Sequence, residues 1–226
     1  MVEIIKLDKN LVIIYKHAGT PSQPDPSGDP DAMTEAAELL ASRGEDSRLW
    51  LVHRLDRTVS GLLVFARNGR AAAELSRISA DGSMGKLYLA VVEGVPEDGL
   101  YTDYLYKDAR LSKAFVTDRS RRGVKLAELE CTKISSKGNK SLCRVRLHTG
   151  RYHQIRVQLA SRKCPIVGDG KYGSRDKGAR MPALTAYRLD FILFGKHYSA
   201  VRLPGAHEYP WCEFANEIDG ERLIYD

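Results

Sequence analysis

The sequence predicts an α+β fold with a mainly antiparallel central sheet flanked by helices. Strand-like apolar runs outnumber helical patterns, neighbouring runs flank short polar turns as in hairpins, and the chain has no internal repeat. A length of 226 residues, of which 43% are hydrophobic and 28% charged, is typical of a globular protein with a packed core. No obvious linker divides the chain.

The N-terminal quarter predicts a hairpin, a loop and a helix in that order. Residues 4–15 form two short apolar runs around a polar turn, which indicates a β-hairpin. Four prolines in residues 21–30 prevent regular structure, so we expect a loop there. A helix capped by Asp31 or Thr34 should follow and end near Gly44.

Strands and one helix are expected around a polar loop in the next quarter. Residues 49–52 and 62–66 are predicted strands, and the loop HRLDRTVSG lies between them. Asn68 is expected to cap the helix that follows. The segment KLYLAVVEG then predicts a strand in which Lys86 and Tyr88 share one face.

The second half predicts a hairpin, a helix and a late strand. Residues 126–134 and 141–148 flank the turn SSKGNK, and the second of these strands alternates between apolar and cationic residues. The segment RYHQIRVQLA, residues 151–160, predicts a helix that begins at Arg151. Residues 184–193 indicate another strand region.

Composition excludes several classes of protein. No apolar run reaches the roughly 20 residues that span a bilayer, and the N-terminus does not resemble a signal peptide, so we expect a cytoplasmic protein without a membrane partner. The four cysteines form no CxxC pair and match no zinc pattern. We therefore expect reduced thiols and no metal.

Basic residues are concentrated in the middle of the chain. Residues 107–163 contain 16 Lys or Arg against four Asp or Glu, a local balance of +12 in a chain of net charge +6. This distribution is typical of a polyanion-binding face, although scattered solvated lysines would give the same count.

Three polar clusters interrupt the apolar pattern. Asp56 lies among basic residues, which favour its ionised form, so it is a candidate nucleophile or general base, or else one half of a structural ion pair. Tyr88 is a core residue or a stacking surface with a proton-transferring hydroxyl. Arg151 at a helix start predicts an opposing anion, unless it points into water.

Together these segments resemble one known family, the RluA-type pseudouridine synthases. HRLDRTVSGLLVFARN is similar to their HRLDxxTSG signature, KLYLAVVEG to KxYLAxVxG, TGRYHQIRVQLA to TGRTHQIRxHLA, and PIVGDGKYG to PIxGDxxYG. IIYKHAGTPSQP resembles their KPAG segment. The matches occur in family order from residue 4 to about residue 195.

The resemblance implies a role for each matching residue. Asp56 corresponds to the essential aspartate, Tyr88 to the active-site tyrosine, and Arg151 to the arginine that pairs with the aspartate. Arg54 matches the arginine that fills the gap left by the extruded base, and Leu184 the apolar residue near the uracil. Other expected RNA contacts are Lys86, His153, Gln154 and Arg156, with Arg119, Arg121, Arg122, Arg144 and Arg146 as further basic candidates.

Some positions depart from the family pattern. His17 replaces the proline of KPAG, Val59 the signature threonine, Tyr152 the threonine before HQIR, and Thr185 a common histidine. The expected His-Pro after the last strand is absent. None of these changes removes a catalytic group, but they indicate a divergent branch.

The resemblance implies a single catalytic domain over residues 1–226, with a cleft across its sheet and no N-terminal S4-type domain. The expected activity is isomerisation of specific uridines in structured RNA, ribosomal or transfer, by a monomer that needs no cofactor. The alternatives are a non-catalytic RNA-binding or ribosome-assembly protein that retains the fold, and a glycosidase or nucleosidase. The motifs offer no second carboxylate for glycoside hydrolysis.

Overall fold

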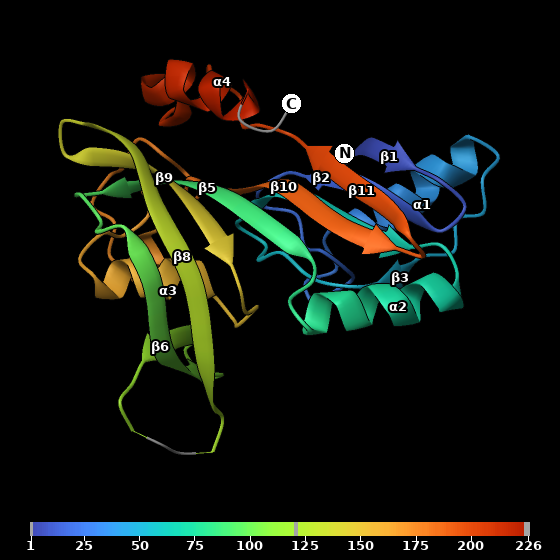
Figure 1. Cartoon of the computed structure of the whole chain (residues 1–226), viewed down its shortest axis with the longest axis horizontal. Coiled ribbons are helices and arrows are strands. Elements are labelled where there is room, and N and C mark those ends of the chain that lie inside the picture. Colours follow the sequence, from blue (N-terminus) through green and yellow to red (C-terminus); the bar gives the residue numbers. More distant parts are fainter. Residues whose placement is uncertain (1, 120–121, 224–226) are drawn as a thin grey trace. The chain divides into compact units, whose positions relative to one another are not determined.

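The computed structural model describes residues 2–119 and 122–223, which form two compact units (Figure 1). The first unit comprises residues 1–85 and 186–202, and the second comprises residues 86–185 and 203–226. The described residues form 11 strands and four α-helices, which confirms the predicted α+β class. Among these residues, no helix has both the length and the apolar composition needed to cross a membrane.

The sheet of the first unit contains six strands. Its order is β1-β2-β4-β10, with β11 beside β10 and β3 beside β4. The predicted N-terminal hairpin is confirmed as β1 and β2, which pair antiparallel. The strand bounds are β1 (Glu3–Leu7), β2 (Leu11–Lys16), β3 (Trp50–Leu51), β4 (Ser60–Ala66), β10 (Leu184–Leu193) and β11 (Lys196–Val201).

Two helices cover this sheet because its strands are apolar on both faces. Every residue of β2 is buried, and alternate residues enter different core clusters. Leu11 and Ile13 pack in the cluster of α2 (Gly69–Ala80), whereas Val12 and Ile14 pack in that of α1 (Ala32–Ser42). Such continuous apolar strands are expected where both faces of a sheet are covered.

Side-chain caps determine where these helices begin. Asp31 accepts hydrogen bonds from the backbone of Met33 and Thr34, each at 3.0 Å. Asn68 accepts one from Ala71 at 2.9 Å. Both carboxamide and carboxylate caps satisfy amide groups that lack a partner within the helix. Capping by Asp31 and Asn68 is thus confirmed, and Gly44 follows the first helix with φ +73°.

The second unit has an antiparallel sheet in the order β5-β9-β8-β6-β7. The predicted hairpin is confirmed as β8 and β9, joined at Lys137 and Lys140. In Figure 1, β6 and β8 continue together as a long ribbon past α3. The strand bounds are β5 (Gly85–Glu93), β6 (Gly99–Asp108), β7 (Lys113–Val116), β8 (Val124–Lys137) and β9 (Lys140–Leu147).

Helices α3 (Gln154–Ser161) and α4 (Ala215–Leu223) are the helices of the second unit. The start predicted for α3 is wrong: the helix begins at Gln154, after His153 with φ 54°, and not at Arg151. A left-handed residue cannot continue a right-handed helix, so residues 151–153 form a separate turn. Val157 of α3 packs with Leu105, Ala127 and Tyr172.

Gly61, the last residue of HRLDRTVSG, is required by the backbone geometry of β4. Its φ is +131°, and an added Cβ would lie 2.4 Å from the backbone nitrogen of Ala186 in β10. Neither the conformation nor the separation tolerates a side chain. The glycine therefore fixes how closely β10 approaches the strand that follows the Asp56 loop.

We expect Gly61→Ala to lower the free energy of unfolding by about 2 kcal/mol or more, because backbone atoms must separate. The matched control is Gly69→Ala, since Gly69 is the first residue of α2 and a Cβ there meets nothing within 4 Å. That control should be neutral or stabilising by up to about 1 kcal/mol. Urea unfolding measures both, and equal stability of the two variants would contradict the close-approach account.

Candidate active site

Asp56 lies in the loop between β3 and β4, and its two apolar neighbours anchor that loop. Leu55 and Val59 are buried, whereas the Asp56 side chain is partly exposed. The carbonyl of Asp56 accepts a hydrogen bond from Val59 N at 3.0 Å, which closes a tight turn. The departure from threonine at Val59 fits this buried position, where an apolar side chain needs no hydrogen-bond partner.

A buried lysine is hydrogen-bonded to the Asp56 loop. Lys16, at the end of β2, is 0% exposed, and its Nζ donates to the carbonyl oxygens of His17 (3.2 Å), Thr20 (2.8 Å) and Arg57 (3.3 Å). Burial lowers the pKa of Lys16 to about 7, while attraction to Asp56 raises it and repulsion from Arg57 lowers it further. The ammonium thus joins two loops and attracts the candidate carboxylate.

The segment after β2 is also hydrogen-bonded to the Asp56 loop. Ser22 Oγ donates to the carbonyl of Leu55 at 2.9 Å and accepts from its amide at 3.0 Å. Gly19 N donates to Arg57 O at 2.8 Å, and Arg57 Nε donates to Gly19 O at 2.9 Å. Arg57 also forms an ion pair with Asp29. The segment matching KPAG therefore supports the Asp56 loop through hydrogen bonds.

The two other basic residues of the loop have different environments. His53 Nε2 accepts a hydrogen bond from Val64 N at 3.3 Å, which ties it to β4. Arg54 is exposed. Arg54 is therefore accessible for the RNA contact that the resemblance implies, and that contact stays a prediction.

Tyr88 and Lys86 lie on β5 in the second unit. Tyr88 is 6% exposed and lies opposite Val145 of β9, so the two side chains are on the same face of the sheet. Lys86 is also buried, and burial lowers the pKa of its ammonium. The predicted alternation places both on one face, but every residue from Lys86 to Val92 is buried, so the strand is covered on both faces.

Arg151 lies in the turn that precedes α3. Its side chain is exposed, and Nε donates to the carbonyl of Leu126 in β8 at 2.8 Å. Its backbone amide donates to Gln154 Oε1 at 3.0 Å. The argument from the helix dipole does not apply, because Arg151 is outside the helix. The guanidinium is instead oriented by a backbone acceptor on a neighbouring strand.

Gln154 organises this turn from within. Its Oε1 accepts from Thr149 Oγ1 at 2.8 Å as well as from Arg151 N, and its Nε2 donates to Glu128 O at 3.0 Å. Gln154 is buried, so these bonds replace those that it would form with water. RNA contact by Gln154 stays a prediction, while the structure shows it as the support of Arg151.

The segments HQIR and PIVGDGKYG interlock. Arg156 and Asp169 are both buried and form two hydrogen bonds, at 2.7 and 2.8 Å. Tyr172 OH accepts from Ala114 N at 2.8 Å and lies 2.9 Å from His153 Nδ1. Burial, reinforced by nearby cations, lowers the pKa of His153 to about 3. His153 is therefore neutral at physiological pH, and its Nδ1 can accept a hydrogen bond from the Tyr172 hydroxyl.

The remaining predicted contacts are spread over the second unit. Leu184 is buried at the start of β10, and Arg144 is held by Glu221 of α4. Arg146 lies 3.9 Å from Glu130, while Arg119 and Arg122 are exposed. Arg121 lies outside the described residues. Sequence reasoning assigned no role to Lys16, Ser22, Asp169 or Tyr172, although all four lie in segments that resemble the family.

The chain is similar to known RNA-modifying proteins. The family model described as RNA pseudouridylate synthase matches residues 10–161. An RNA pseudouridine synthase of Haemophilus influenzae is 30% identical over 210 residues, which cover 92% of this chain and 90% of that protein. Ribosomal large subunit pseudouridine synthase D of Zymomonas mobilis is 32% identical over 78% of this chain and 57% of its own length.

Solved structures show the same fold. The structure of human RNA pseudouridylate synthase domain containing 4 has a TM-score of 0.74 and 24% identity, covering 96% of this chain and 93% of that chain. At this identity the likeness concerns the fold alone.

Replacing Lys16 with Met should change how the free energy of unfolding depends on pH. The variant leaves three carbonyls without their shared donor, so the free energy of unfolding should fall by about 2 kcal/mol at mildly alkaline pH. The pKa of Lys16 is lower in the folded protein, about 7, than its ordinary value of 10.5. The unfolded chain therefore binds more protons between these values, and wild-type stability rises with pH there.

The stability difference between wild type and Lys16→Met should consequently widen as pH rises from about 7 towards 10. Urea unfolding at several pH values measures it. Lys9→Met, at an exposed lysine of the same unit, is the control and should change the free energy of unfolding only slightly. A pH-independent loss in Lys16→Met would argue against a perturbed ammonium.

Proposed function

Because the chain belongs to the RNA pseudouridylate synthase family, in its RluA-type branch, we propose that it converts specific uridines in structured RNA to pseudouridine with Asp56 as the catalytic carboxylate. The enzyme is an isomerase: the N1–C1′ glycosidic bond breaks, the uracil turns over, and a C5–C1′ bond forms. The C5 hydrogen is lost and N1 gains one, so the product has the composition of the substrate.

The environment of Asp56 carries this proposal. The reaction needs a carboxylate close to C1′ that is held in place while the base is free. Asp56 is partly buried in a turn closed by its own carbonyl, between two buried apolar anchors and near the Lys16 ammonium. A carboxylate positioned in this way is suited to attack the ribose or the base, or to assist elimination to a glycal.

We assign Tyr88 and Arg151 supporting roles by their match to the family motifs. Tyr88 offers a phenol for stacking on the uracil and for moving a proton at C2′ or C5. Arg151 is proposed to keep Asp56 ionised and oriented through a charge-assisted hydrogen bond. Its Nε is already bound to Leu126 O, which leaves the two terminal nitrogens to face a carboxylate.

The substrate is proposed to be ribosomal or transfer RNA. Relatives named as ribosomal large subunit synthases support the first of these, and a target uridine must leave its helix at a cost of a few kcal/mol. We also propose that both units belong to one catalytic domain. The family model supports this, because residues 10–161 include parts of each unit.

Tritium release from RNA labelled at uridine C5 tests the central proposal, since the C5 hydrogen is lost on product formation. Asp56→Asn should reduce release to background and leave RNA binding nearly unchanged, because the substitution removes only the charge. Asp118→Asn, at an exposed aspartate of the second unit, is the control and should retain full activity. Normal release by Asp56→Asn would refute the assignment, and wild-type binding without any release would refute the activity.

Arg151→Ala should lower turnover by at least about 100-fold while RNA affinity changes little, as expected for a group that acts mainly in the transition state. Arg43→Ala, at an exposed arginine outside the predicted RNA contacts, should keep its turnover. Single-turnover tritium release at saturating enzyme separates the two effects. Unchanged turnover in Arg151→Ala would remove this residue from the catalytic set.

A further inference from the structure

An aromatic stack lies directly after Arg151 in the second unit. The rings of Tyr152 and His153 are parallel within 18° with centroids 3.8 Å apart, and Tyr172 meets His153 edge-on at 5.6 Å. His153 and Tyr172 are buried. The hydrogen bond between His153 Nδ1 and Tyr172 OH fixes their relative orientation. These three rings form a rigid platform, which we call the aromatic stack.

Three lysines, here the lysine cluster of Lys107, Lys113 and Lys171, gather around this stack. Lys107 Nζ lies 4.4 Å from the centre of the Tyr152 ring, and Lys113 Nζ lies 5.1 Å from that of Tyr172. Lys171 Nζ donates at 3.0 Å to the carbonyl of Ser112, the same oxygen that accepts from Tyr152 OH at 3.3 Å. Cation–π contacts and one hydrogen bond thus position three ammonium groups.

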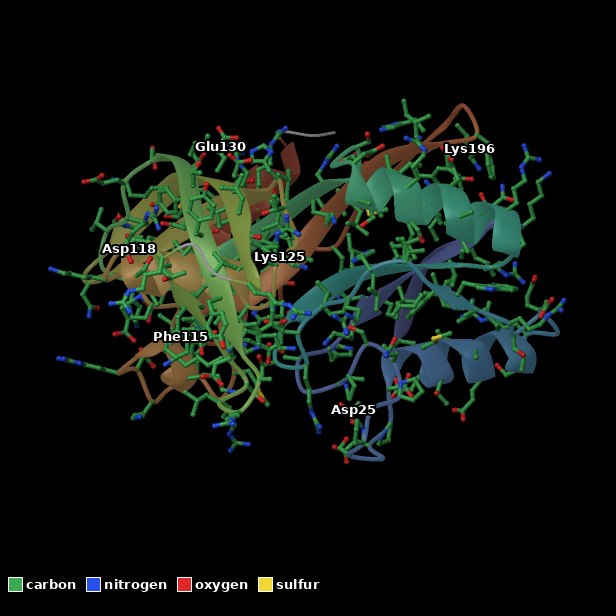
Figure 2. The ribbon with its side chains drawn as sticks, turned by 90° about the horizontal axis from the view of Figure 1, so that it is seen from below. Asp25, Phe115, Asp118, Lys125, Glu130 and Lys196 are labelled. Carbon is green, nitrogen blue, oxygen red and sulfur yellow. The ribbon has the colours of Figure 1, made fainter. Side chains whose placement is uncertain are left out.

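Lys113 lies on β7, the last strand in the sheet order, and also approaches a more exposed ring. Its Nζ is 5.7 Å from the centre of the Phe115 ring. Phe115 is labelled in Figure 2. Lys107 and Lys171 are themselves exposed, and Lys113 is partly buried. All three ammonium groups are therefore within reach of a ligand in solution.

The lysine cluster has no acidic partner among the described residues. In residues 2–119 and 122–223, none of the three lysines forms an ion pair, and Arg156 beside them is neutralised by Asp169. Asp108, opposite Lys113 in the β6–β7 register, uses its Oδ1 to accept from the amides of Arg110 and Leu111. Lys107 and Lys171 also contribute to the low pKa of His153, as expected where positive charges converge.

The geometry favours a phosphate over a base as the ligand. One side of the Tyr152 ring stacks on His153, and Lys107 covers the ring as well. Tyr172 is buried. A nucleobase therefore finds no open ring of the stack to lie on, whereas a phosphate can approach the ammonium groups from solvent. Lysine binds phosphate as a point charge and does not need a planar partner.

We propose that Lys107, Lys113 and Lys171 form a phosphate-binding site for the backbone of the substrate RNA. This inference rests on the proposed function and adds a specific contact to it. Because Tyr152 follows Arg151 directly, phosphates bound here lie beside the segment that carries the proposed catalytic arginine. Tyr152, which stands where the family has threonine, supplies the ring that holds Lys107.

Salt-dependent binding of a fluorescein-labelled RNA hairpin with a uridine-rich loop tests the site. The triple variant Lys107→Gln, Lys113→Gln and Lys171→Gln should bind roughly tenfold more weakly, and its slope of log affinity against log salt should be smaller by about 2. The matched control replaces three other exposed lysines with glutamine, Lys9, Lys133 and Lys177, which form no ion pair or ring contact with the residues that the structure describes. The control should keep the wild-type slope.

A second triple variant with arginine at the same three positions keeps the charge and should bind as wild type does, provided that its urea unfolding is normal. If the glutamine variant and the control lose equal affinity with equal slopes, the effect is one of net charge and the site is refuted. Wild type that does not bind the hairpin also refutes it. RNA binding with the expected slopes but without tritium release supports the site while refuting the proposed activity.

Discussion

The Asp56 loop depends on the hydrogen bonds that the buried side chain of Lys16 donates. A fully buried lysine is costly unless its protons are hydrogen-bonded, and here they are donated to carbonyls of the segment after β2 and of the Asp56 loop. The same charge attracts Asp56. One side chain therefore joins the end of β2, the segment after it and the Asp56 loop, so that the position of the carboxylate is set by the core of the first unit.

In the second unit, the turn before α3 and the segment PIVGDGKYG are held in place by hydrogen bonds of a neutral amide and by one buried ion pair. Gln154 holds the turn that carries Arg151, while Arg156 and Asp169 connect α3 to the segment PIVGDGKYG. These partners are buried, so removing any one of them would leave a polar group without its hydrogen bonds. Around the neighbouring aromatic rings lie Lys107, Lys113 and Lys171, which have no acidic partner in the described part of the chain. The buried residues that hold this turn and the lysine cluster thus lie next to each other.

The structure also explains why particular motif positions are restricted. Gly61 is needed because β10 passes too closely for a Cβ, and Val59 is buried where a hydroxyl has no required partner.

The sequence pattern did not predict β6 and β7 in the middle of the chain. β6 and β7 mix exposed and buried residues without a clear period, and they become strands through pairing with each other and with β8. Local pattern could not reveal them, because cross-strand partners determine their conformation.

The sequence by itself determined the α+β class, the two capped helices, the β8–β9 hairpin and the family, because apolar periodicity, capping residues and motif order are local or linear properties. It also pointed to Asp56, Tyr88 and Arg151 through their motifs. Only the tertiary structure decided that α3 begins after Arg151, that Lys16 is hydrogen-bonded to the Asp56 loop, and that Lys107, Lys113 and Lys171 gather around one aromatic stack. Those features join residues distant in sequence, and their burial and hydrogen bonds exist only once the strands have paired.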